Sequence, residues 1–285
     1  MFPFGHFAKI KAKNASGVEK KVVDVAANTA LLKEAKFSHL HNHSQFSILQ
    51  STITIKGLVK QAIANNSEGV ALTDTGNMMA AFHFVREVLS HNKGVEGRRK
   101  EAEENGTDFT EQPLMPIVGC EFNVCEDHLN KSVKDNGYQI VIIAKNENGY
   151  HNLAKMSSIA FTHGKYYVPR IDKKVVEQYK EDLIVLTGNI YGEVPSKILN
   201  IGEKQAEEAF LWWKEQFGDD FYAEIIRHGQ EDEDKINETL IQFAEKHDVK
   251  LVASNNTFYL DQEDAEAHDT LLCIKDGELR NTPVG

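Results

Sequence analysis

Phe37-Ser38-His39-Leu40-His41-Asn42-His43-Ser44 is the stretch from which the fold can be traced. Its histidines stand at every second position, and the side chains of an extended segment alternate between two faces. The imidazoles are therefore expected on one side of a strand end, where histidine is a common metal ligand. Solvated histidines at a polar strand end are the alternative that this spacing leaves open.

Downstream of this stretch, short apolar runs alternate with segments of helical periodicity. The runs predicted as strands are residues 37–41, 69–73, 115–122, 138–144, 183–187, 221–226 and 250–254. The segments predicted as helices are residues 55–65, 77–91, 148–160, 206–217, 236–247 and 262–274, with a charged surface excursion at 92–113. Such alternation predicts an α/β fold with a parallel sheet covered by helices, and seven units fit a closed β/α barrel.

Composition narrows the class of protein. The chain has 285 residues and a formal net charge of −11, which is a poor match for a phosphate backbone. Binding to DNA is therefore expected only through a partner or a further domain. Cys120, Cys125 and Cys273 form no Cys-x-x-Cys pair, and no run resembles a signal peptide or a membrane span. A cytoplasmic protein is expected.

Polar residues follow the predicted strands, at the end where barrel active sites gather. They are His41, His43, Asp74, Glu121, Asn189, His228, Asn255 and Asn256, whereas Gln139 begins its strand. Imidazole and carboxylate ligands bind zinc, manganese or iron, so His41, His43 and Glu121 are the candidate metal ligands. Asp74 is a candidate to orient one of them from outside the ligand shell. Few other ionisable groups converge there.

Several motifs resemble the PHP (polymerase and histidinol phosphatase) domain at the N-terminus of bacterial DNA polymerase III alpha subunits, most closely those of Bacteroidetes type. They run in order from residue 37 onward, and residues 1–36 have no match. The motifs are His39-Leu40-His41-Asn42-His43-Ser44-Gln45-Phe46-Ser47, Ala71-Leu72-Thr73-Asp74, Gly76-Asn77-Met78, Gly119-Cys120-Glu121-Phe122, and residues 144–150, 166–172 and 264–269. The resemblance implies a distorted seven-stranded β/α barrel at residues 37–285, after an accessory segment at residues 1–36.

The resemblance also implies ligand positions. Metal-binding members hold up to three ions at nine positions, and three of these keep their ligands here as His41, His43 and Glu121. The positions that have lost their ligands are Gln50, Thr75, Gln139, Asn189, Asn256 and Phe258. We therefore expect no multinuclear phosphoesterase site. At most one weak ion site remains, formed by His41, His43, Glu121 and Asn256 and completed by water.

Three functions stay open at this point. The leading one is a structural and interaction module that braces the rest of the alpha chain and docks the proofreading exonuclease subunit. The second is a residual metal-dependent phosphoesterase or 3′–5′ exonuclease, and the third is a free-standing histidinol-phosphatase-like enzyme. The full-length parent is expected to be a DNA-directed DNA polymerase. Nothing in this chain resembles the polymerase palm aspartates, so the piece itself is not expected to polymerise DNA.

Overall fold

The fold is that of a computed structural model, which describes residues 37–280. The predicted accessory segment at residues 1–36 lies outside the described residues, so its boundary stays a prediction. Among residues 37–280, no helix combines the length and the apolar character that crossing a bilayer requires.

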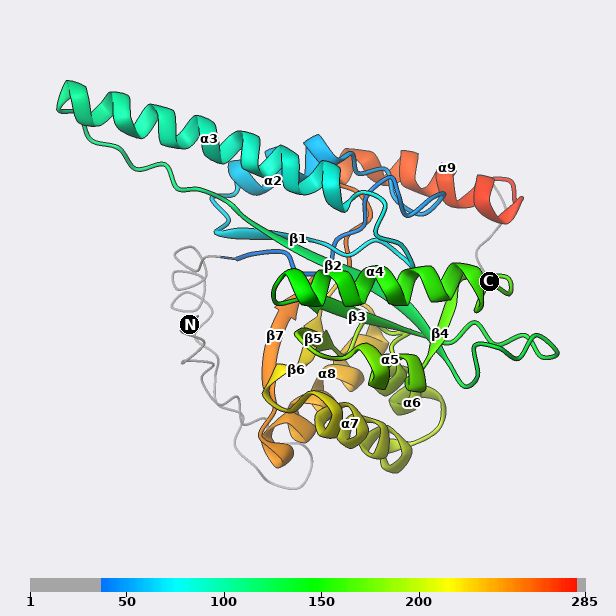
Figure 1. The fold of residues 1–285 in the computed structure, drawn as a ribbon. Coiled ribbons are helices and arrows are strands. Elements are labelled where there is room, and N and C mark those ends of the chain that lie inside the picture. Colours follow the sequence, from blue (N-terminus) through cyan, green and yellow to red (C-terminus); the bar gives the residue numbers. More distant parts are fainter. Residues whose placement is uncertain (1–36, 281–285) are drawn as a thin grey trace. The chain divides into compact units, whose positions relative to one another are not determined.

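One curled sheet of seven strands organises the described residues (Figure 1). Its strands are β1 (Gly69–Leu72), β2 (Met115–Cys125), β3 (Tyr138–Ala144), β4 (Arg170–Asp172), β5 (Leu183–Leu186), β6 (Phe221–Ile226) and β7 (Lys250–Ser254). Their order is β1-β2-β3-β5-β6-β7, and β4 pairs with β2. The prediction of an α/β fold built on a distorted seven-stranded barrel is confirmed.

Helices cover the outer face of this sheet. They are α2 (Ile55–Ala64), α3 (Ala81–Asn105), α4 (Glu147–Thr162), α5 (Lys173–Tyr179), α6 (Glu193–Asn200), α7 (Glu203–Phe217), α8 (Glu231–His247) and α9 (Ala265–Asp276). In Figure 1, α2, α3 and α9 lie beyond the β1 and β2 end of the sheet, whereas α5 to α8 gather around β5 to β7. Two separate outer cores match this arrangement, one around α2, α3 and β1 and the other around α4 to α8.

A third, smaller core lies inside the curl and positions the polar site. It consists of strand residues such as Val141, Leu186 and Val252, without any helix residue among its buried members. Strand side chains alternate between faces, so Glu121 shares the inner face with Ile117, and Glu224 shares it with Tyr222. An apolar layer therefore supports a polar layer at one end of the sheet.

The direction of β3 differs from the expected parallel arrangement. β3 runs antiparallel to both β2 and β5, while the other pairs are parallel. Its first residues therefore lie at the edge where the neighbouring strands end. Because of this reversal, Gln139 at the start of β3 lies at the same edge of the sheet as the residues that follow the ends of the neighbouring strands.

The predicted first strand, residues 37–41, is not a regular strand. Its pairing is divided between two neighbours: the His39 carbonyl accepts from Ala71 N–H on one side, and the His41 carbonyl accepts from Thr257 N–H on the other. The side chain of Asn42 donates to the Ala71 carbonyl at 2.9 Å and so replaces a main-chain ladder bond. Residues 39–43 thus join the β1 edge of the sheet to the chain that follows β7.

Two further elements differ from the sequence prediction. The expected excursion after residue 91 is helical, because α3 continues to Asn105 and buries Val95 and Ala102 on one face. It ends at Gly106, whose φ of 66° suits glycine. β4 has three residues, which is too short for a period-two pattern to reveal.

Candidate metal centre

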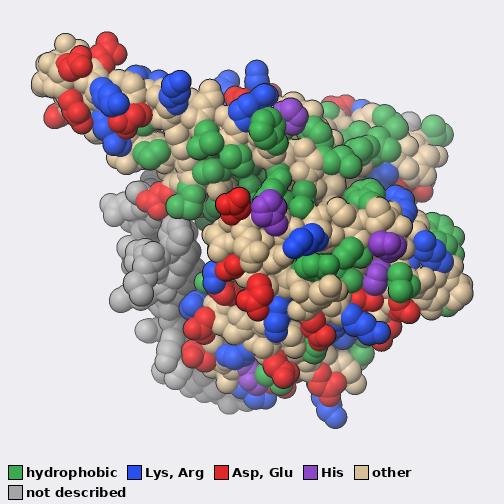
Figure 2. Space-filling model, viewed as in Figure 1, with side chains coloured by type: hydrophobic (Ala, Val, Ile, Leu, Met, Phe, Trp, Pro, Cys, Tyr) green, Lys and Arg blue, Asp and Glu red, His purple; other side chains and the backbone are tan. Residues whose placement is uncertain are grey.

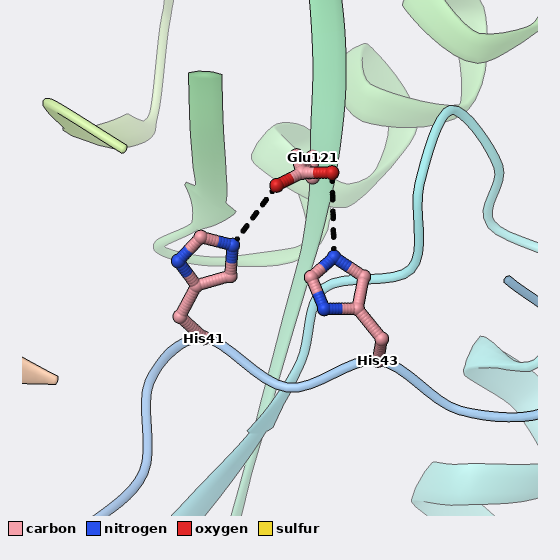
Figure 3. Close-up of side chains that lie close together, drawn as sticks. All are labelled: His41, His43 and Glu121. Carbon is pink, nitrogen blue, oxygen red and sulfur yellow. Dashed lines mark hydrogen bonds and ion pairs between the residues drawn. The ribbon is translucent and has the colours of Figure 1, made fainter. Parts of the chain in front are cut away.

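His41, His43 and Glu121 meet at the polar end of the curled sheet (Figure 3). His41 Nε2 lies 3.1 Å from Glu121 Oε2, and His43 Nε2 lies 3.3 Å from Glu121 Oε1. One ligand atom from each residue falls within 4.8 Å of the others. All three side chains are buried, so water has little access to them.

The extended backbone of residues 39–43 aims both imidazoles at Glu121. His43 N–H donates to the Thr257 carbonyl at 3.0 Å, and Thr73 N–H donates to the Asn42 carbonyl at 2.9 Å. Asn42 faces the opposite way, toward β1, where its side chain donates to backbone carbonyls. The period of two places His41 and His43 on the same side.

Asp74 fixes the turn that follows His43. Its carboxylate accepts from the backbone N–H of Ser44 at 2.7 Å and from the hydroxyls of Ser44 and Ser47 at 2.8 and 2.7 Å. Asp74 therefore acts on the chain one residue beyond His43 rather than on an imidazole ring. Its predicted part in orienting a ligand stays a prediction, with this backbone contact as the route.

Neutral side chains occupy positions where the resemblance expects ligands. The Thr75 hydroxyl donates to Glu121 Oε1 at 3.0 Å. The Asn189 amide donates to Glu121 Oε2 at 3.3 Å and to Gln139 Oε1 at 2.8 Å. Both Glu121 oxygens thus have neutral donors in addition to the two histidines, and Gln139 is satisfied by an amide.

Phe258 takes the place of another expected ligand and covers His43. The two rings stack with centroids 4.2 Å apart and planes 6° from parallel. His268 stacks on the same phenyl ring at 5.8 Å, and its Nε2 lies 2.8 Å from the Gln50 carbonyl oxygen. An aromatic side chain offers no ligand atom, so Phe258 supplies no metal donor on the face of His43 that it covers.

The pKa values of the triad follow from its burial and its charges. Burial lowers the pKa of His41, but the carboxylates of Glu224 and Glu121 outweigh burial and raise that pKa to about 10. Burial likewise opposes ionisation of Glu121, whereas His43 and His41 bring its pKa well below the usual range. His41 and Glu121 are therefore held as a buried ion pair, with the Glu224 carboxylate as a further anion beside His41.

Glu224 is the site residue that sequence reasoning missed. Its Oε1 lies 3.0 Å from His41 Nδ1, and neither side chain is exposed. The signal was present in the sequence, because a carboxylate in the middle of the apolar run 221–226 is costly to bury without a partner. The sequence prediction favours residues at strand ends, and one of them, His228, pairs with Glu233 at the start of α8 rather than with the triad.

A second group of ligand-type residues lies elsewhere, at Asp127, His128 and Asp172. Asp172 Oδ1 accepts from Val175 N–H at 3.0 Å and thereby caps α5, while Asp172 Oδ2 lies 2.6 Å from His128 Nδ1. These contacts satisfy both carboxylate oxygens. The contacts of Asp172 therefore have a structural explanation, namely capping α5 and pairing with His128.

The main triad fits one divalent ion by its chemistry. Two imidazoles and one carboxylate are ligands typical of zinc, manganese or iron. Nδ1 of His43 and Oδ1 of Asn256 are buried without a hydrogen-bond partner, and Nε2 of His43 has only the 3.3 Å ion-pair contact with Glu121. Asn256 directly precedes Thr257, which pairs with the histidine segment, so its predicted place as a further weak ligand is compatible with the backbone path.

Comparison with known proteins gives a consistent family. The family model for the PHP domain matches residues 39–228. The DNA polymerase III subunit alpha of Borreliella burgdorferi is 36% identical over 255 residues, which cover 87% of this chain and 20% of that protein. The corresponding subunit of Aquifex aeolicus is 34% identical over 249 residues, covering 84% of this chain and 20% of that protein. The chain therefore spans about a fifth of the length of these curated relatives.

Among solved structures, an amidohydrolase from Chromobacterium violaceum aligns with a TM-score of 0.47 and 12% sequence identity. The alignment covers 80% of this chain and 89% of that chain.

Proposed function

Because the chain belongs to the PHP domain family, we propose that it is the PHP domain of a DNA polymerase III alpha subunit and acts in DNA replication as a structural and interaction module. The observation that carries this proposal is the set of neutral donors around Glu121. Thr75 donates to Oε1 of Glu121 and Asn189 donates to Oε2, so both oxygens of this candidate metal ligand have neutral donors.

This arrangement lowers the cost of an ion-free site. Carboxylates that cluster without a metal repel one another, whereas amides and hydroxyls hydrogen-bond to one another without net charge. Asn189 bridges Glu121 and Gln139 in this way. Such a cluster supports a domain that keeps its fold whether or not an ion is bound.

One ion is the most that the remaining ligands support, at His41, His43 and Glu121, with Asn256 as a weak fourth donor. When bound, zinc, manganese or iron would supply a Lewis acid that activates water. The residues of this chain would only hold that ion, and Phe258 supplies no further metal donor on the face of His43 that it covers.

Exposed apolar side chains at the start of α3 support the interaction role. Phe82 and Leu89 are 68% and 56% exposed, and their spacing of seven places them on one face of α3, while Met79, which is 59% exposed, lies in the turn just before the helix. Figure 2 shows hydrophobic side chains gathered over this part of the surface. We name Met79, Phe82 and Leu89 the α3 stripe and propose that another polypeptide of the polymerase covers it.

The remaining partners follow from charge and family. A net charge of −11 disfavours direct binding to DNA, so DNA is met only within the holoenzyme, through other domains. We propose the rest of the alpha chain and the proofreading exonuclease subunit as partners, in the cytoplasm.

A hydrolysis assay separates the module from a residual phosphoesterase or 3′–5′ exonuclease. The chain is incubated with manganese, zinc or iron(II) and either a phosphomonoester or an end-labelled primer. We expect product release no higher than that of His43→Ala. The matched control is His151→Ala, which removes a histidine that is 59% exposed. Metal-dependent release that disappears in His43→Ala and persists in His151→Ala would show that the domain is an enzyme.

A binding assay tests the interaction role. The exonuclease subunit and the remainder of the alpha chain are each added to this chain, and complexes are followed by size-exclusion chromatography. We expect a complex that is weakened at least tenfold by Phe82→Ser with Leu89→Ser. Val133→Ser, at a residue that is 63% exposed in the β2–β3 loop, serves as the control. If this chain forms a complex with neither partner, the proposed role as an interaction module is contradicted.

A further inference from the structure

Glu224 is a buried carboxylate whose position follows from the sheet. It lies on β6 opposite Val252 of β7, and its backbone N–H donates to the Thr187 hydroxyl at 2.9 Å. Its side chain is fully buried on the inner face and reaches His41 Nδ1 at 3.0 Å through Oε1. The pairing with β7 and the bond to Thr187 fix the backbone of Glu224, and its buried side chain contacts the ring through Oε1.

The two nitrogens of His41 face different carboxylates. Nδ1 faces Glu224 Oε1, whereas Nε2 lies 3.1 Å from Glu121 Oε2 on the side of the candidate metal centre. Glu224 is not among the residues whose ligand atoms lie within 4.8 Å of one another. Its place is therefore behind the ring, outside the candidate ligand set.

A carboxylate accepts hydrogen bonds, so the His41 nitrogen that faces Glu224 carries a proton. Nε2 faces Glu121, a member of the candidate ligand set, so a metal bound there would take the place of the proton on Nε2. Carboxylates behind ligating histidines fix the ring orientation and raise the basicity of the ligand, and their loss typically weakens metal binding 10- to 100-fold.

We propose that Glu224 is a positioning residue that holds His41 with Nδ1 protonated and Nε2 directed at the metal centre. The inference rests on the single residual ion site of the proposed function. It adds to that site a residue on β6, a strand that contributes none of its ligands.

Zinc titration of the whole chain tests the proposal. The dissociation constant for Zn²⁺ is measured against a chromophoric chelator for the wild type, Glu224→Gln and Glu224→Leu. The glutamine oxygen can still accept from Nδ1–H, so we expect Glu224→Gln to stay within about tenfold of the wild type. Glu224→Leu removes the acceptor, and we expect its affinity to fall about 10- to 100-fold.

The matched control is Glu233→Gln, which alters another buried glutamate that contacts a histidine, His228, at 2.8 Å. We expect it to bind Zn²⁺ as the wild type does. Equal affinity of Glu224→Leu and the wild type would overturn the proposal, as would an equal loss in Glu233→Gln and Glu224→Leu.

A second measurement needs no metal. In the metal-free protein, nitrogen-edited NMR of the imidazoles should show a slowly exchanging Nδ1–H proton on His41, assigned by its absence in His41→Gln. We expect this signal in the wild type and its loss in Glu224→Leu. If the wild type binds no Zn²⁺, the residual ion site fails, and the Nδ1–H signal alone then decides the role of Glu224: its presence supports the role, and its absence overturns it.

Discussion

Glu121 is the residue on which the site converges. Its two carboxylate oxygens lie within 3.3 Å of groups from four other residues, His41, His43, Thr75 and Asn189. Charged and neutral partners are therefore mixed around one side chain. This mixture is the basis of our proposal that the site holds no more than one ion.

The charge of His41 predicts a pH dependence of stability. Its pKa is raised from 6.5 to about 10, so the stabilisation is complete below pH 6.5 and is lost as pH rises through about 10. We expect the free energy of unfolding, measured by urea denaturation with chelator present, to fall between pH 7 and pH 10. The part of this decrease in unfolding free energy that is due to His41 is on the order of 3 kcal/mol.

The His41→Asn variant provides the control for this prediction. Lysine and tyrosine residues also titrate near pH 10, but they do so equally in both proteins. The wild type should therefore lose more stability than His41→Asn over the same pH range. Equal losses would mean that His41 is not held as a cation by Glu224 and Glu121.

Asn256→Asp is expected to strengthen metal binding. A carboxylate is a better donor to zinc or manganese than a neutral amide oxygen, and Asn256 Oδ1 is buried without a partner. We expect the dissociation constant, measured by isothermal titration with Zn²⁺, to fall about tenfold or more.

Thr75→His is the companion variant for this prediction. It restores an imidazole at a lost position, but its would-be neighbours Gln50 and Phe258 supply no ligand. Zinc affinity should therefore stay close to that of the wild type. An unchanged affinity in Asn256→Asp would show that Asn256 does not adjoin the ion.

Residue chemistry and spacing were enough to nominate His41, His43 and Glu121, which the fold brings within reach of one another. They were not enough to find Glu224 or the bond between Asn189 and Gln139. Both depend on which strands are neighbours and on the directions in which they run. The spacing of apolar side chains in the sequence predicts neither the neighbours nor the directions. Only the cost of burying a charge in the run 221–226 pointed to Glu224.

At the scale of elements, the reversal of β3 has the largest effect on the site. Apolar runs predict that a strand exists but not which way it points. With β3 antiparallel to β2 and β5, Gln139 reaches Asn189 at the polar edge. A parallel β3 would place that amide at the opposite end of the sheet.

Arg170 in β4 anchors the loop between β2 and β3. Its guanidinium is fully buried and donates to the backbone carbonyls of His128, Asn130, Asp135 and Gly164. Arg170→Met should leave these carbonyls without donors and lower the free energy of unfolding by about 2–4 kcal/mol. Urea denaturation measures the loss, and limited proteolysis should show new cleavage within residues 126–137.

Arg98→Met, in α3, is the control for the Arg170→Met variant. Arg98 forms a two-pronged ion pair with Glu111, but its side chain is 51% exposed. Solvent screens exposed ion pairs so that they contribute little to stability, and this variant should unfold close to the wild type. A loss of similar size in both variants would count against a special role for the buried guanidinium.

At the scale of the whole molecule, the fold should depend little on metal. Glu121 and His41 have protein partners of their own, and a weak site occupied near its dissociation constant adds only about 0.4 kcal/mol. We expect chelator to change the melting temperature by about 1–2 °C relative to protein with zinc, as measured by calorimetry. A shift of about 10 °C or more would indicate a structural metal and contradict the module with a residual site.

The alternation of apolar runs and helical segments predicted the barrel-like architecture, and the larger elements lie close to where they were expected. The strand prediction was wrong at residues 37–41, whose few main-chain bonds are divided between β1 and the chain after β7. Residues 37–41 have the composition of a strand, but the Asn42 side chain takes over a ladder bond. Such a substitution of side chain for backbone depends on contacts that are remote in the sequence.

The junction of residues 39–43 with Thr257 sets an order of assembly. The contact joins Asn42 to a residue 215 positions later, so the intervening chain must be synthesised and largely ordered before the sheet edges can meet. During translation, β1 to β6 emerge while the histidine segment still lacks one neighbour. We expect pulsed hydrogen exchange during refolding to show the amides of His43 and Thr257 protected after those of β2 and β3; earlier protection would contradict this order. The segment that identifies the domain would then be among the last parts of it to become native.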